Sequence, residues 1–233
     1  MRARSNTTVV ATLVALVAVF AGCSSTAPPS ATTVPPASSS TSTSTSVPSI
    51  IQPATAIWPF VANTPGYPDP VEAARTFAVD YLGFATPVIG SFQQGDSQSG
   101  EVNVQASPSG PVTTVLVRML TSASTWWVLG ASTPNLRLES PAALATIASP
   151  VILSGQSTAF EATVNVQIRQ DGMLTPLKED ILMGGANGDM GPFSKSISFP
   201  HPNSRAGAIV LKTMSAKDGN ISEASVIRVS FSS

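Results

Sequence analysis

Apolar and polar side chains alternate with a period of two in successive segments of residues 139–233, as in Val164, Val166 and Ile168 with their polar neighbours. This alternation is typical of β-strands that bury one face and expose the other. Because such strands need a second layer over their apolar face, the pattern limits this region to a layered β structure. We expect seven strands, at residues 136–139, 151–158, 163–170, 177–183, 193–199, 208–214 and 224–231.

Turn signals separate several of these segments. The dipeptides Asp171-Gly172 and Asp218-Gly219 lie between alternating runs and are typical of tight turns. Seven short strands joined by turns are enough for two packed sheets. The sequence therefore predicts an all-β immunoglobulin-like sandwich over residues 139–233. An inter-sheet disulfide is excluded, because Cys23 is the only cysteine in the chain.

Several short motifs of this region also occur in order in a known domain. They are Ser149-Pro150-Val151, Leu153-Ser154-Gly155, the run 159–164, the passage from Gly184-Gly185 to Gly191-Pro192-Phe193, and Lys217-Asp218-Gly219. In these motifs the region resembles the immunoglobulin-like domain of bacterial spore germination, which often lies beside GerMN domains. The resemblance implies an extracellular binding or structural module without catalytic residues. No GerMN-like segment precedes it, so the resemblance does not imply a role in germination.

The region before the sandwich begins with a predicted helix at residues 70–82. Asp69 is suited to cap its first turn, Pro70 to occupy the first helical position, and Glu72 to reach back to the cap. Gly83 can end the helix in a left-handed conformation. One side of this helix carries an apolar stripe, made by Val71, Ala74, Phe77, Ala78 and Tyr81.

Strand patterns follow this helix. We expect strands at 88–94, 101–106, 112–120 and 126–133, with a turn at 107–110. One helix followed by consecutive strands predicts an α+β module over residues 57–138, with the helix lying across an antiparallel sheet.

The last two of these strands are apolar on both faces, and Trp126 and Trp127 point to opposite sides. A single helix covers only one face. The segment 58–60 or the second module covers the other face, or else Trp126 and Trp127 form a binding surface for a partner or a glycan.

The N-terminus has the order of a secretory signal. Arg2 and Arg4 precede an apolar run at 9–20, and the small residues Ala21 and Gly22 lead to Cys23. The junction resembles a bacterial lipobox, which implies a signal peptide at 1–22 and lipidation, such as palmitate, on Cys23. The alternative is an unmodified thiol beside an ordinary cleavage site. Lipidation would place the protein on the extracytoplasmic face of the cell membrane.

Residues 23–56 are rich in Ser, Thr and Pro and contain no charged residue. Such a segment has too little apolar surface to offset the entropy of ordering it, so we expect a disordered tether, with or without O-glycosylation. Loss of residues 1–22 removes two basic residues and no acidic one, which takes the formal charge from −1 to about −3. A chain with this charge has no basic footprint for nucleic acid.

The sequence offers no catalytic constellation, no metal site and no cofactor motif. His201 is the only histidine and lies between two prolines in an expected loop. The glycine-rich run 184–191 lacks the lysine of a phosphate-binding loop and the acid spacing of a calcium loop. We therefore expect a non-enzymatic binding or scaffolding protein whose partner is a protein or a cell-wall glycan. The alternatives are an envelope hydrolase built around His201 and an accessory lipoprotein of a larger membrane complex.

Overall fold

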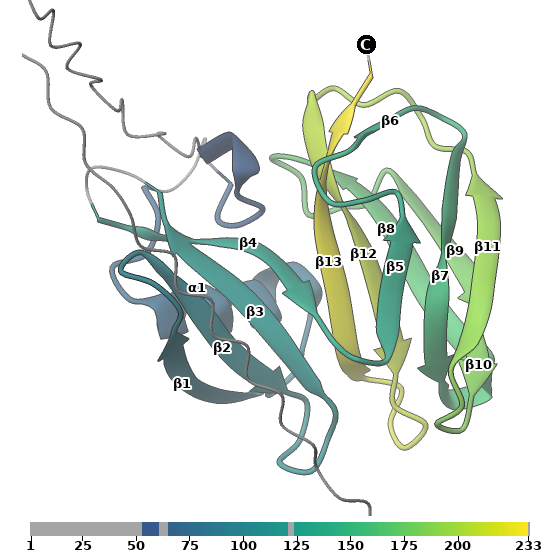
Figure 1. Cartoon of the computed structure of the whole chain (residues 1–233), viewed down its shortest axis with the longest axis horizontal. Coiled ribbons are helices and arrows are strands. Elements are labelled where there is room, and N and C mark those ends of the chain that lie inside the picture. The colour runs from purple at the N-terminus through teal and green to yellow at the C-terminus, as the bar shows by residue number, and fades with distance from the viewer. Residues whose placement is uncertain (1–52, 61–64, 121–123, 233) are drawn as a thin grey trace, which may run out of the picture. The chain divides into compact units, whose positions relative to one another are not determined.

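One nine-stranded sheet contains strands from both predicted modules (Figure 1). The computed structural model describes residues 53–60, 65–120 and 124–232. Neighbouring strands of the main path are antiparallel, and β6 (Thr146–Ile147) adds to β13 in parallel. The strand order is β1 (Val88–Gln94), β2 (Ser99–Gln105), β3 (Val112–Met119), β4 (Trp126–Ser132), β13 (Ile221–Phe231), β12 (Ala206–Met214), β8 (Thr163–Gln170) and β9 (Lys178–Met183).

The helical segment comprises α1 (Pro70–Thr76) and η2 (Phe77–Leu82), as the sequence predicts for 70–82. The Asp69 side chain accepts a hydrogen bond from the Glu72 backbone N–H at 2.9 Å, and Gly83 ends the segment at a φ of 92°. The second half is a π-helix, with the Gly83 N–H bonded to the oxygen of Ala78. The prediction for the Glu72 side chain is wrong: its carboxylate accepts a hydrogen bond from Arg75 Nε at 2.8 Å, because that guanidinium lies one turn away.

The helical segment packs on one face of the sheet. Its buried side chains include Phe77 and Tyr81, which stack at 5.1 Å, and they meet the alternate residues Val102 and Val104 of β2. The same core contains five residues from the outer face of the sandwich, Ala208, Val210, Ile221, Ala224 and Val226. The helix therefore covers strands from both parts of the chain.

A smaller four-stranded sheet covers the opposite face of β8, β12 and β13. It contains β5 (Leu136–Ser140), β7 (Val151–Ala159), β10 (Gly185–Ala186) and β11 (Gly191–Ile197). Between the two sheets lies a core that includes Leu153, Val166, Ile168, Phe193 and Leu211. The immunoglobulin-like sandwich and all seven of its expected strands are present. The expected boundary between residues 138 and 139 falls inside β5, which begins to pair with β7 at Leu136.

Two short 3-10 turns complete the described elements, η1 (Pro53–Thr55) and η3 (Phe160–Ala162). No helix in the described ranges is long and apolar enough to span a bilayer. The expected signal peptide, Cys23 and nearly all of the expected tether lie outside the described residues.

A candidate binding groove beside strand β5

Both tryptophans proposed as a binding surface lie in the interior. Trp126 is 9% exposed and packs edge-on against Phe92, with ring centroids 5.1 Å apart, in the core beneath the helix. Trp127 is 2% exposed and lies on the other side of β4, where Ala56 and Leu120 cover it. Neither ring is available to a partner in this structure, because contacts within the chain cover both faces of the strand.

Residues 56–60 contribute side chains to both faces of β4. Trp58 lies on the helix side, where its Nε1 donates to Thr76 Oγ1 at 3.1 Å and its ring packs against Phe60 and Tyr81. Ala56, two residues earlier, lies on the opposite side against Trp127. Trp58 forms an antiparallel bridge with Val128 of β4, so the chain runs along the edge of this strand with side chains on both of its sides. Trp58 and Phe60 cover the helix side, and Ala56 covers the other.

Beyond Trp127, no described segment covers the face opposite the helix, which forms a groove of about 560 Å³. We call this cavity the β5 groove. Its floor includes Leu116 of β3, Leu129 of β4 and Ile227 of β13, and its wall includes Leu136 and Leu138 of β5. The groove exists because the large sheet continues past the edge of the small sheet, whose outermost strand on this side is β5 (Figure 1).

Large apolar side chains remain exposed along the β5 groove. Leu116 on the floor is 39% exposed, and Leu144, on the rim after β5, is 61% exposed. The rim is held in place by the Leu144 N–H, which donates to the backbone oxygen of Arg228 at 2.7 Å. Apolar side chains gathered in one concave site, together with a few polar groups, are typical of a binding site.

Glu223 fixes the connection that leads into the wall of the groove. This β13 side chain is 4% exposed and accepts hydrogen bonds from the hydroxyl groups of Thr133 and Thr213 and from Asn135 Nδ2, the last at 3.2 Å. Thr133 and Asn135 lie between β4 and β5. A buried carboxylate needs such partners, so these bonds hold the start of β5 against β12 and β13.

Three arginines and no carboxylate line the β5 groove among the described residues. Arg228 is fully engaged: it pairs with both oxygens of Asp171, at 2.5 and 2.6 Å, and donates to the backbone oxygen of Ala54. Arg118 Nη1 lies 3.8 Å from Asp96 Oδ2, and its buried Nε has no hydrogen-bond partner in the described part of the chain. Arg228 lies opposite Ala208, which belongs to the core under the helix, so its side chain is on the helix side of the sheet. The positive charge of the groove therefore comes from Arg118 and Arg137.

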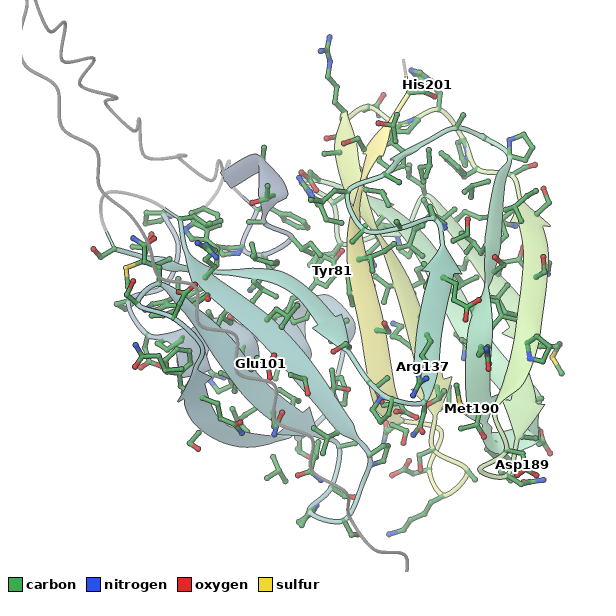
Figure 2. All side chains as sticks on the ribbon, viewed as in Figure 1. Tyr81, Glu101, Arg137, Asp189, Met190 and His201 are labelled. Atoms are coloured by element: carbon green, nitrogen blue, oxygen red, sulfur yellow. The ribbon has the colours of Figure 1, made fainter. Side chains whose placement is uncertain are left out.

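Arg137 is the third of these arginines and stands on β5 itself (Figure 2). Its Nε donates to the backbone oxygen of Pro134 at 3.2 Å, and it forms no ion pair with any described residue. Glu101 of β2 lines a second hollow of about 470 Å³ that shares Leu116, Arg118 and Leu129 with the groove. The lining is therefore positively charged near β5, and toward β2 it contains both an arginine and a glutamate.

His201 and the glycine-rich run 184–191 lie at opposite ends of the sandwich (Figure 2). His201 is exposed in the loop between β11 and β12, at the end of the sandwich opposite Asp189 and Met190 (Figure 2). Within the described ranges, no three His, Cys, Asp or Glu side chains are grouped so as to hold a metal ion. The glycine-rich run forms β10 and a turn in which Gly188 has a φ of 93° and donates its N–H to Thr158 Oγ1.

The β5 groove was not predicted from the sequence. Its one sequence signal is the apolar character of both faces of residues 112–120 and 126–133, which includes Leu116 and Leu129. The wall could not be predicted in this way, because it depends on which strand of the sandwich lies at the edge of the small sheet.

The comparisons with known proteins identify one part of the chain. Neither the curated proteins nor the solved structures gave a match. Residues 135–220 match a family model described as the immunoglobulin-like domain of bacterial spore germination. This range begins with the connection into β5 and ends just before β13, so the match covers most of the sandwich, which is similar to that family.

Proposed function

We propose that the protein is a lipid-anchored binding or scaffolding module on the extracytoplasmic face of the cell membrane, and that it acts without catalysis. The observation that carries this proposal is the immunoglobulin-like domain, which indicates a binding or scaffolding role. The β5 groove supports it, since it offers an apolar, positively charged surface without a grouped set of catalytic side chains among its lining residues. The partner is a protein or a glycan of the envelope.

Anchoring is proposed from the N-terminal sequence. Arg2 and Arg4, the apolar run and Cys23 have the order of a lipoprotein signal. One acyl chain gives only marginal membrane binding, whereas two or more hold a protein stably. Residues 24–52 would then act as a spacer with a reach on the order of 30 Å.

Labelling with radioactive palmitate in a bacterial host tests the anchor. We expect label in the wild-type protein and in a Ser24→Ala control, and none in Cys23→Ala. The label should travel with the membrane fraction, because the thiol of Cys23 is the acceptor. Label in Cys23→Ala, or an unlabelled wild-type protein released from the membrane, would contradict the proposal.

A further inference from the structure

We propose that the β5 groove binds an extended peptide segment of a partner protein, in which an acidic residue is flanked by apolar residues. This inference rests on the proposed binding function and specifies its ligand. Three features of the groove carry it: a free strand edge, an apolar floor and two arginines that no carboxylate fully neutralises.

The first feature is the edge of β5. This strand pairs with β7 on one side. On its other side, along the groove, the described residues provide one bridge, in which the Leu136 N–H donates to the Thr133 backbone oxygen at 3.4 Å, so the free edge begins after Leu136. An edge strand presents backbone N–H and C=O groups to which an extended peptide can add. The part of β5 after Leu136, residues 137–140, spans about 13 Å and suits a peptide of about four residues.

The second feature is the spacing of apolar positions around that edge. Leu116 and Leu129 lie on the floor, and Leu144 lies on the rim. In an extended peptide alternate side chains point the same way, so one set faces the floor while the other faces solvent or the rim. Burying a leucine-sized side chain is favourable, which gives the floor a preference for apolar residues.

The third feature is the charge of the groove. Arg118 stands on the floor, where its one ion pair among described residues is the 3.8 Å contact with Asp96, and Arg137 stands on the wall without an ion pair among described residues. A guanidinium binds a carboxylate through two parallel hydrogen bonds. An acidic side chain in the bound peptide would therefore be favoured, and a basic one would be repelled.

Two other occupants fit this chemistry less well. The chain's own residues 24–52 contain no charged residue and cannot neutralise the arginines. In a second copy, the outer strands β1 and β11 contain no acid. The outer strand β9 does contain acids. Lys195 Nζ, however, donates to Asp180 Oδ1 at 2.7 Å and to the Ile181 backbone oxygen at 3.0 Å. Part of the backbone edge of β9 is therefore already occupied.

Selection from a random twelve-residue peptide library tests the proposal. The bait is residues 23–233 with Cys23→Ser, which keeps the whole mature chain and avoids the lipid. We expect enriched peptides with an Asp or Glu between apolar residues. A fluorescein-labelled peptide of the enriched sequence should bind at least tenfold more weakly to Arg137→Glu, measured by fluorescence anisotropy. Arg205→Glu is the matched control, because Arg205 is an exposed arginine outside the groove, and it should bind like the wild type.

Four other results of the selection and the binding measurement would overturn the proposal. Uncharged Ser/Thr/Ile peptides would indicate the chain's own N-terminal segment, and peptides matching one of its strands would indicate a second copy. Equal weakening by Arg137→Glu and Arg205→Glu would indicate nonspecific charge attraction, and no enrichment would exclude peptide binding. None of these results affects palmitate labelling of Cys23, so the failure of this inference is distinguishable from failure of the anchor.

Discussion

Two cations of the sandwich contact the end of the helical segment. Arg169 Nη1 donates to the backbone oxygen of Tyr81 at 2.7 Å, and Lys212 Nζ donates to that of Leu82 at 3.3 Å. The last carbonyl groups of a helix lack partners within it and carry partial negative charge, so they are natural acceptors for cations. The guanidinium of Arg169 also lies 4.6 Å from the centre of the Tyr81 ring. These contacts join the helix to the sandwich.

Lys212 makes this contact dependent on pH. Burial, with a smaller contribution from the charge of Arg169, lowers the pKa of Lys212 to about 8. The unfolded chain keeps this proton until about pH 10.4. Between these values the unfolded state binds more protons, so the free energy of unfolding should rise with pH. We expect a rise of about 1–3 kcal/mol from pH 8 to pH 10, measured by urea unfolding.

Substitution of the lysine isolates this effect. Lys212→Met should lack the rise, whereas Lys217→Met, which removes an exposed lysine, should retain it. Equal pH profiles for wild type and Lys212→Met would show that Lys212 titrates alike in the folded and unfolded states.

At the scale of elements, the junction of β4 with β13 depends on a glycine. The pairing there rests on Val226 opposite Ala131. A Cβ added to the neighbouring Gly130 would lie 2.8 Å from the backbone oxygen of Val226, closer than such atoms pack. Gly130→Ala should therefore push the strands apart and lower the free energy of unfolding by about 1–3 kcal/mol.

Gly95→Ala is the control for this substitution. It lies in the turn after β1, where an added Cβ would meet its nearest atom at an ordinary 3.6 Å. Urea unfolding should show a loss for Gly130→Ala well above that for Gly95→Ala. Equal losses would mean that the close approach at β4 and β13 does not contribute to stability.

The elements themselves could largely be predicted from sequence. The period-two alternation predicts strand 163–170 at its observed bounds, and Asp69 and Gly83 mark the helix ends. Local patterns do not reveal which strands pair across the chain. Lys212, for example, lies in an apolar strand whose outer face is buried only because the helix packs on it. The burial of Trp126 and Trp127 and the β5 groove depend on the same long-range pairing.

At the scale of the molecule, the central claim is that one sheet joins the helical part to the sandwich. The helix covers one face of this sheet, the small sheet covers the other face, and the β5 groove lies where neither reaches. Because β4, β12 and β13 share one core with the helix, neither part can lose its structure without exposing apolar surface of the other.

Differential scanning calorimetry of residues 23–233 with Cys23→Ser tests this claim most directly. We expect a single transition whose calorimetric enthalpy equals its van't Hoff enthalpy, as for one cooperative unit. Two separable transitions, one for the helical part and one for the immunoglobulin-like domain, would contradict it.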